Sequence, residues 1–516
     1  MNLLRTLFTV TTFTLLSRIT GLAREVLIAR IFGASLYTDA FNVAFRIPNL
    51  LRRLSAEGAF SQAFVPILAE FKSQKGHDAT RALVNATGIV LAWVLVVFST
   101  LGIVGSGFVV WVVASGLNHN DQIFALSVTM TRIMFPYILL ISLTSLASSV
   151  LNTYQNFSLP AFSPVLLNVS FIFGTLVIAP RLETPIYALA LAVLAGGVLQ
   201  LLIQLLGLKR VEMMPQIRPN LAQALAHPGI KRVLLKMMPA SFAVSVAQLS
   251  LIVNTNIASH LLPGSVSWLS YADRLMEFPT ALLGGAIGTI LLPNLSKAHV
   301  DANAEEYSAL LDWGLRLTFL LAAPSAVALF VYAKPLTATL FNYGRFSGYD
   351  VVMVSRALAA YGVGLLGLIL TKILAPGFYA KQDIKTPVKI ALIVAGITQL
   401  CNIVFVPYFA HAGLSLSISI GACVNALLLF TGLRRRSIYI PSAGWGVFFL
   451  QLISACLMLA GAMYWFTGLV DWVALGHYPG MRIAALGVTL VILAILYFAI
   501  LFLTGFKYAY FYRYVK

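Results

Sequence analysis

The chain has 516 residues, of which 59% are hydrophobic and only 10% are charged. Soluble domains carry about 25% charged residues, so this composition excludes an ordinary soluble protein. The 35 Lys and Arg residues outnumber the 17 Asp and Glu residues and give a formal net charge of +18. The apolar content excludes a disordered chain, and a nucleic-acid binder would carry its basic residues on a polar surface. A multi-pass helical membrane protein remains.

The apolar segments predict fourteen transmembrane helices, because a span needs about 20 predominantly apolar residues. The N-terminal segment is interpreted as the first of them and not as a cleavable signal, since Arg18 and Arg24 interrupt its apolar run. No strands are expected. In chain order, the predicted helices cover residues 3–32, 39–70, 80–114, 123–151, 159–180, 184–208, 228–260, 267–296, 306–332, 350–379, 385–407, 411–433, 443–467 and 480–505.

The basic residues in the loops and near the ends of these helices predict the orientation of the chain. If the N-terminus is cytoplasmic, twenty of them fall on the cytoplasmic side and four on the opposite side. Both termini are therefore predicted to be cytoplasmic. The four residues on the opposite side are Arg181, Lys334, Arg345 and Arg482.

The other eleven basic residues fall within the predicted helices or at their edges. A basic residue that faces lipid at the bilayer centre costs about 2.5–3.5 kcal/mol, so eleven of them would cost roughly 30 kcal/mol. Those near helix ends are expected to reach the interface or to pair locally, namely Arg30, Arg132, Arg316 and Arg356. The rest are expected to face a water-filled interior: Arg18, Arg24, Arg46, Arg52, Arg53, Arg274 and Lys372.

Two halves of the chain resemble each other at a nearly constant offset. Residues 64–66 match residues 291–293, and residues 44–46 match residues 272–274, at offsets of 227 and 228. Six helices per repeat predict parallel repeats, related by an axis along the membrane normal, that form two lobes around a central cavity. The predicted domains are an N-lobe of residues 1–217, a C-lobe of residues 218–441, and two further helices in residues 442–516.

Arginine dominates the charges that are predicted to face this cavity. Its planar guanidinium binds phosphate oxygens in a bidentate manner and stays charged. A surplus of arginine therefore favours an anionic substrate with a di- or polyphosphate, whereas a proton-coupled drug exporter should centre on buried carboxylates. The candidate substrate-binding residues are Arg18, Arg24, Arg52, Arg274, Asn49 and Lys372.

Acidic residues are interleaved with these arginines, so ion pairs that only hold helices together stay an alternative. Arg53 and Glu57 are four residues apart, and Arg274 and Glu277 are three apart, which places each pair on one helix face. Ion pairing cannot neutralise all of the positive charge, because six basic residues face only five acids. The basic residues are Arg18, Arg24, Arg52, Arg53, Arg274 and Lys372, and the acids are Glu25, Asp39, Glu57, Asp273 and Glu277. The candidate gating or ion-pair residues are Glu25, Asp39, Arg53, Glu57, Asp273 and Glu277.

Several further motifs concern the backbone. Pro48 and Asn49 stand within the second predicted helix and predict either a break that lines a cavity or a simple kink, and both stay open. The small residues Gly284, Gly285 and Gly288 indicate close helix packing or a bend.

Other signals are discounted. Residues 362–367 match G-x-G-x-x-G but lie in an apolar segment with no preceding strand, so a dinucleotide site is not expected. Cys401, Cys423 and Cys456 show no C-x-x-C spacing and are interpreted as buried helix residues. The sequence shows no catalytic triad, no Walker A motif and no metal-ligand spacing. We therefore expect no enzyme activity, cofactor or metal.

Long blocks of the sequence resemble the MurJ/MviN family of the MOP exporter superfamily. They include residues 17–21, 24, 29–34, 39–41, 45–53, 56–66, 271–279, 375–379 and 383–387, and the resemblance covers essentially the whole chain. It implies a fourteen-helix fold and a lipid II flippase of the bacterial inner membrane. The implied substrate is an undecaprenyl-diphosphate-linked disaccharide-pentapeptide, moved from the cytoplasmic to the periplasmic leaflet.

The resemblance also implies roles for single residues. Four positions match the family's essential cavity arginines and a fifth is implied to be important: Arg18, Arg24, Arg52, Arg274 and Asp39. The last two helices match those that form a hydrophobic groove for the lipid tail. Many members have Arg-Asp where this chain has Arg24-Glu25, so a gate salt bridge here would use a longer acid.

These observations suggest alternating access by rocking of the two lobes, with the diphosphate bridging Arg24 and Arg52 to Arg274. The membrane potential or a cation gradient is the expected energy source. Lipid II and membrane lipids are the expected partners, with transient contact with the cell-wall synthesis machinery, no nucleic acid, and a monomeric chain.

The alternatives are a flippase for another polyprenyl-diphosphate-linked saccharide and a cation-coupled multidrug exporter. A glycosyltransferase that uses undecaprenyl phosphate would need a sizeable extracytoplasmic loop. The loops of this sequence are short, which disfavours that enzyme class.

Overall fold

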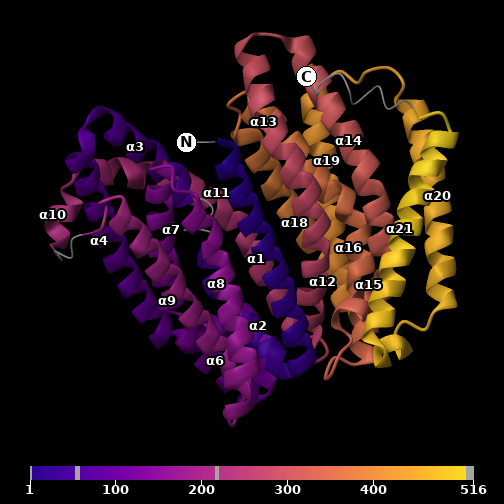
Figure 1. The fold of residues 1–516 in the computed structure, drawn as a ribbon, viewed down its shortest axis with the longest axis horizontal. Helices are drawn as coiled ribbons and strands as arrows, with labels where there is room; N and C mark the ends of the chain where they lie inside the picture. The colour runs from indigo at the N-terminus through magenta and orange to yellow at the C-terminus, as the bar shows by residue number, and fades with distance from the viewer. Residues whose placement is uncertain (1–2, 53–58, 216–219, 507–516) are drawn as a thin grey trace. The chain divides into compact units, whose positions relative to one another are not determined.

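The computed structural model of the protein describes residues 3–52, 59–215 and 220–506. Within these ranges the regular structure is entirely helical, as the sequence predicts. The chain divides into two compact units, residues 1–266 (unit 1) and residues 267–516 (unit 2). Each unit is a bundle of helices (Figure 1). Helices suit such an apolar chain because each one satisfies its own backbone hydrogen bonds, which lipid cannot do.

Unit 1 is built on contacts that α8 makes with α1 and α9, and that α2 makes with α6. A π-helical turn follows α8 at Gly174–Ile178. Its helices are α1 (Leu3–Phe32), α2 (Leu36–Arg52), α3 (Ala59–Gln74), α4 (Gly76–Val104), α5 (Ser106–Ala114), α6 (Asp121–Met134), α7 (Tyr137–Thr153), α8 (Ser158–Phe173), α9 (Tyr187–Arg210), α10 (Leu221–Leu225) and α11 (Pro228–Ser259).

In unit 2, α16 packs against α14 and α19, and α20 packs against α14 and α21. A second π-helical turn, Thr280–Gly284, separates its first two helices. The helices are α12 (Ser265–Pro279), which begins just before the boundary between the units, α13 (Gly285–Val300), α14 (Ala304–Val331), α15 (Ala333–Phe341), α16 (Gly348–Leu374), α17 (Pro376–Tyr379), α18 (Lys385–Phe409), α19 (His411–Arg435), α20 (Trp445–Leu469) and α21 (Pro479–Leu503).

Each of the fourteen predicted segments contains helix in the structure. Eleven helical stretches among the described residues are long and apolar enough to cross a membrane. The predicted segments outside that set correspond to α1, to α2 with α3, and to α11. The helices α2 and α3 have 17 and 16 residues, so each is shorter than any of the eleven stretches. The prediction did not foresee α10 or α15, because both are too short to span a bilayer.

The helix α2 runs through Pro48 to Arg52. Proline removes one backbone N–H donor and crowds the preceding turn, but a helix can pass through it with a kink. Of the two alternatives for Pro48 and Asn49, the structure therefore has the continuous helix. Residues 53–58 lie outside the described part of the chain.

Each unit has its own apolar core, and the two cores use equivalent positions of the predicted repeat. Nine buried residues of unit 1 have counterparts 227 positions later that are buried in the core of unit 2. This agreement is what an internal repeat predicts, although the proposed lobe boundaries stay a prediction. The residues are Phe60, Phe64, Leu68, Phe71, Leu83, Val84, Leu146, Ala147 and Leu151 in unit 1, and Ile287, Leu291, Leu295, Ala298, Leu310, Leu311, Ile373, Leu374 and Phe378 in unit 2.

The G-x-G-x-x-G stretch of α16 is a helix-packing surface. A Cβ atom placed on Gly364 would lie 2.3 Å from Cα of Ser419, and one on Gly367 would lie 2.6 Å from the backbone nitrogen of Cys423. A Cβ on Gly362 would lie 2.8 Å from the backbone nitrogen of Phe330 on α14. These glycines let α16 approach both neighbours closely, as small residues do in membrane helices.

Candidate functional site

The best-defined part of the candidate site surrounds Arg24 on α1. The Arg24 guanidinium forms an ion pair with the carboxylate of Glu25 and donates from Nη1 to Oδ1 of Asn168 on α8, over 3.0 Å. Its central carbon lies 4.9 Å from the ring centroid of Phe171, also on α8. The Arg24 side chain is only 12% exposed. One carboxylate, one amide and one aromatic face therefore hold this arginine.

Asn168, on α8, also hydrogen-bonds to two other residues of α1, the helix that carries Arg24. Its Nδ2 donates to the carbonyl oxygen of Ser17 over 3.0 Å and to the hydroxyl of Thr20 over 3.2 Å. Asn168 is 7% exposed. The sequence analysis did not single it out, although an asparagine in the middle of an apolar predicted helix is a signal that could have done so.

The structure describes only some of the other predicted site residues on α1 and α2. Arg18 is exposed on α1, six residues before Arg24. Arg52 is the last residue of α2, and its side chain is not described, while Arg53 and Glu57 lie outside the described residues. Asn49 is partly buried on α2. The predicted Arg53–Glu57 pair therefore stays a prediction.

Asp39 stands in the first turn of α2 and is 3% exposed. Its Oδ2 accepts the backbone N–H of Gly264 over 2.7 Å, in the turn that follows α11. Gly264 has φ of +94°, a conformation that favours glycine. Nearby, Arg46 donates to the hydroxyl of Thr255 on α11 over 2.7 Å. Asp39 and Arg46 thus fasten α2 to the end of α11.

In unit 2, the predicted pair of Arg274 and Glu277 is confirmed on α12. The Arg274 Nη1 and the Glu277 Oε2 are 3.3 Å apart, and the two side chains are 38% and 47% exposed. Lys372 on α16 donates from Nζ to the carbonyl oxygen of Thr280 over 3.4 Å. Asp273 is partly buried beside Arg274. Unit 2 therefore presents exposed basic groups, unlike the enclosed Arg24.

The side chain of Lys372 crosses over the π-helical turn of unit 2. A Cβ on Gly284 would lie 2.7 Å from Cδ of Lys372, whereas Gly285 has open space around it. Of the three glycines predicted to pack closely, Gly284 therefore makes room for a lysine side chain. Gly288 lies against the backbone of the same residue.

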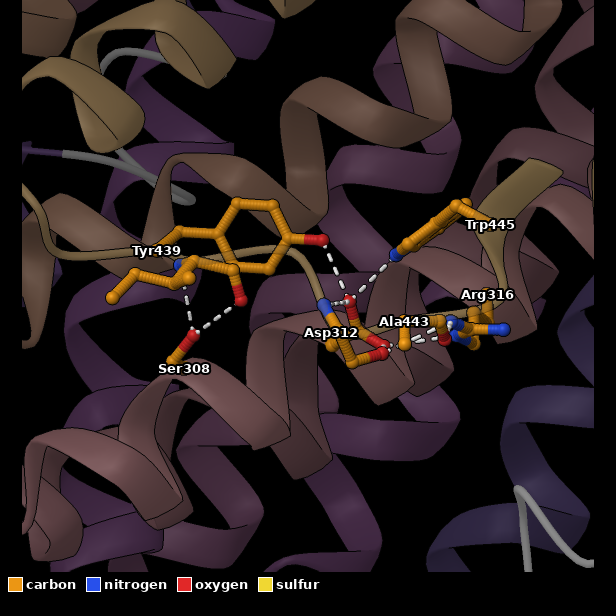
Figure 2. A network of polar contacts seen from close by, with 8 residues as sticks. Ser308, Asp312, Arg316, Tyr439, Ala443 and Trp445 are labelled. Atoms are coloured by element: carbon orange, nitrogen blue, oxygen red, sulfur yellow. Dashed lines mark hydrogen bonds and ion pairs between the residues drawn. The ribbon is translucent and has the colours of Figure 1, made fainter.

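Arg316 was predicted to reach the interface or to pair locally, and the local pair is confirmed. It is 2% exposed and its Nε donates to Oδ2 of Asp312, one turn earlier on α14, over 2.9 Å. Figure 2 shows Asp312 as the centre of a polar cluster. Tyr439 Oη and Trp445 Nε1 each donate to Oδ1 of Asp312 over 2.8 Å, and the Ser442 hydroxyl donates to Oδ2 over 2.6 Å. Burial, together with the bond to Asp312, raises the pKa of Tyr439, so its hydroxyl remains a donor.

Arg482 was counted among the basic residues on the non-cytoplasmic side, at the start of the predicted helix 480–505. It stands in the first turn of α21, and its side chain is fully buried. Its Nη2 donates to the carbonyl oxygen of Asn342 over 2.9 Å, and its Nη1 donates to that of Trp472 over 3.2 Å. Loop carbonyls provide the polar environment that water would otherwise supply.

The three cysteines are also not all buried. Cys423 is exposed, and Cys401 and Cys456 are intermediate. In a membrane protein, a residue that faces lipid also has apolar surroundings. The hydropathy of the sequence therefore does not distinguish a lipid-facing cysteine from one in the protein core. Among the described residues, no three His, Cys, Asp or Glu side chains come close enough together to hold a metal ion.

The sequence matches a family model described as lipid II flippase MurJ over residues 28–481. It is 69% identical to the lipid II flippase MurJ of Burkholderia cenocepacia, across the full length of both chains. It is 43% identical to a probable lipid II flippase MurJ of Buchnera aphidicola subsp. Acyrthosiphon pisum, with 89% of each chain covered.

Two solved structures have a similar fold. One is a lipid II flippase MurJ in an inward closed conformation, with a TM-score of 0.79, 22% identity, and coverage of 96% of this chain and 99% of that one. The other is an inward-facing MATE multidrug transporter of the MOP superfamily, with a TM-score of 0.69, 14% identity, and coverage of 83% and 98%. At these identities the likeness concerns the fold alone.

Proposed function

The chain belongs to the MurJ family of lipid II flippases, and from this premise we propose that it carries lipid II from the cytoplasmic to the periplasmic leaflet of the bacterial inner membrane. It is a multi-pass membrane protein. The strong bias of basic residues toward one side supports cytoplasmic termini. The 69% identity over the full chain is the observation that carries the proposal.

The chemistry of the substrate explains why arginines are needed. A diphosphate cannot enter hydrocarbon without counter-charge, because a buried unpaired charge is very costly. We propose that Arg24, Arg52 and Arg274 bind the diphosphate, with Arg18, Lys372 and Asn49 contributing. The polyprenyl tail needs no such site, since it is as apolar as the bilayer. The last two helices, α20 and α21, are proposed to border its path.

The state of Arg24 suggests how binding starts. Glu25 neutralises Arg24, so a diphosphate must compete with this carboxylate for the guanidinium. Asn168 and Phe171 would keep the guanidinium in position while the anion replaces Glu25. Glu25, Asp39, Asp273 and Glu277, with Arg53 and Glu57, are thus proposed as residues that hold or release the site during alternating access.

The energy source is proposed to be the membrane potential or a cation gradient. Moving one elementary charge across 100 mV is worth about 2.3 kcal/mol, enough to reset a positively charged site after substrate release. The protein is proposed to act as a monomer without a cofactor, in transient contact with the cell-wall synthesis machinery.

The test is an Arg274→Ala variant in cells whose own flippase has been depleted, with lipid II in each leaflet measured by a periplasm-restricted probe. We expect lipid II to accumulate in the cytoplasmic leaflet at normal expression of the variant. Arg345→Ala, in an exposed loop, is the matched control and should restore translocation. Normal translocation by Arg274→Ala would show that the proposed diphosphate contact is wrong. Survival of function after loss of the arginines, but not of one carboxylate, would favour a cation-coupled exporter.

A further inference from the structure

An apolar groove of about 440 Å³ lies in unit 2, between α14, α16, α19 and α20. This volume is in the range of small-molecule and cofactor sites. The groove is lined almost entirely by apolar side chains, including Phe319, Leu427, Phe430 and Phe449. No residue of α21 lines it, so it is distinct from a groove between the last two helices.

The groove opens toward the lipid-facing surface of unit 2. Leu427 is 59% exposed and Cys423 is also exposed, although both line the groove. In a helix that crosses a membrane, exposed apolar groups contact hydrocarbon chains. Tyr439 and Trp445 close one end, and these residue types are enriched where hydrocarbon meets the headgroup region. The shape and position therefore fit a hydrocarbon chain whose polar end lies beside Tyr439 and Trp445.

A positive charge stands at the same end. The Arg434 guanidinium lies 6.0 Å from the ring centroid of Phe430, which lines the groove, and Arg434 and Arg435 are both exposed. The next residue, Arg436, is instead bound to the carboxylate of Asp383 over 2.6 Å. Arginine binds phosphate oxygens with two parallel hydrogen bonds. The groove thus combines an apolar lining with an exposed arginine beside one of its lining residues.

We propose that this groove binds one anionic glycerophospholipid, with an acyl chain between α14, α16, α19 and α20 and the phosphate at Arg434. The end wall is fixed in place before any lipid arrives, because Tyr439 and Trp445 both donate to Asp312. Binding would fasten α19 to α20 through the lipid. The site requires only that unit 2 is embedded in a membrane, and it does not depend on lipid II transport.

The test is native mass spectrometry of the full-length protein from nanodiscs that contain equal amounts of 1-palmitoyl-2-oleoyl phosphatidylglycerol and the corresponding phosphatidylethanolamine. We expect the wild type to retain phosphatidylglycerol preferentially. Leu427→Trp should lower its occupancy at least fivefold, and Arg434→Gln should abolish the headgroup preference. The matched controls are Leu457→Trp, an exposed position on α20 outside the groove, and Arg345→Gln in a loop.

A second arm blocks the groove after folding. In a Cys401→Ser, Cys456→Ser background, modification of Cys423 with benzylmaleimide should lower phosphatidylglycerol occupancy as Leu427→Trp does. Unchanged occupancy after this modification would overturn the proposal, as would an unchanged headgroup preference in Arg434→Gln. Displacement of phosphatidylglycerol by equimolar undecaprenyl phosphate would show that the groove takes a prenyl chain instead, and the proposal would then be wrong. These readouts measure binding, so a failed lipid II translocation assay leaves them unaffected.

Discussion

Arg24 is held by Asn168, and the effect of that contact can be measured. Asn168→Leu removes the acceptor for Nη1 of Arg24 and the donors to Ser17 and Thr20. A hydrogen bond to a charged group contributes about 1.5–3 kcal/mol, so we expect translocation to fall roughly tenfold or more. The measurement is the rate of lipid II appearance in the outer leaflet of reconstituted vesicles.

A double-mutant cycle separates positioning from folding. In an Arg24→Ala background, Asn168→Leu should add little further loss, because both changes remove the same interaction. Asn168→Gln, which keeps an amide, should recover part of the activity. Additive losses would contradict a positioning role for Asn168.

The pH dependence of stability should include a contribution from Asp383, between α17 and α18. The pKa of Asp383 is lowered to about 2 from the ordinary 3.8. The cause is a set of hydrogen bonds from the hydroxyl and the backbone N–H of Thr386 and from Arg436. A lowered pKa in the folded state stabilises the protein above the ordinary pKa, and this contribution is lost as the pH falls through about 2. The difference in unfolding temperature between wild type and Asp383→Asn should therefore be constant above about pH 5 and shrink on acidification. Glu305→Gln, in the exposed first turn of α14, is the control.

At the scale of single helices, the contact between α16 and α19 should be the least tolerant of added volume. Gly364→Ala would place a methyl group 2.3 Å from Cα of Ser419, where backbone atoms must move. Overpacking of this kind costs about 1–3 kcal/mol. The midpoint of thermal unfolding in detergent should fall for Gly364→Ala and for Gly367→Ala. Gly461→Ala on α20 meets no atom within 4 Å and should raise the midpoint slightly or leave it unchanged.

The helices themselves were largely predictable, and the reason is the solvent. A bilayer demands about 20 apolar residues per crossing and leaves helix as the only structure for a single segment, so hydropathy locates α4, α9 or α21 almost by itself. The same pattern could not resolve α15, which is short. It also could not decide whether α2 continued through Pro48, because neighbouring helices determine how a proline is tolerated.

For the candidate site, the sequence identified residues but not their partners. Arg274 and Glu277 are neighbours on one helix, so their pairing followed from spacing alone. Asn168 lies 144 positions from Arg24 in the chain, and Tyr439 lies 127 positions from Asp312. Contacts across such separations depend on how helices pack, which no local pattern contains.

At the scale of unit 2, the last two helices are attached at both ends by buried arginines. Arg316 donates from Nη2 to the hydroxyl of Ser442 and to the carbonyl of Ala443 just before α20, and Arg482 fixes the start of α21. Asp312→Ala would leave Arg316 without its carboxylate, and breaking a buried pair costs about 3–5 kcal/mol. We expect a lower unfolding temperature and faster trypsin cleavage at Arg434–Arg436. Asp301→Ala, in an exposed turn, is the control.

A second substitution makes this prediction specific. Replacing both partners, as Asp312→Met with Arg316→Met, should recover much of the lost stability, because no buried charge then lacks a partner. The Tyr439 and Trp445 donors lose their acceptor in this variant, so the linker before α20 should stay more sensitive to trypsin than in the wild type. Wild-type resistance of this linker to trypsin in the double variant would contradict the role of Asp312 as the common acceptor.

The position of Asp312 one turn before Arg316 has a consequence for biosynthesis. When α14 leaves the ribosome, the residues that will surround Arg316, from Tyr439 to Trp445, have not yet been translated. An arginine alone would then oppose transfer of the segment into lipid. Because its carboxylate partner belongs to the same helix, the nascent segment carries its own neutralising group. The membrane can thus accept α14 early, and the same carboxylate later accepts hydrogen bonds from Tyr439, Ser442 and Trp445.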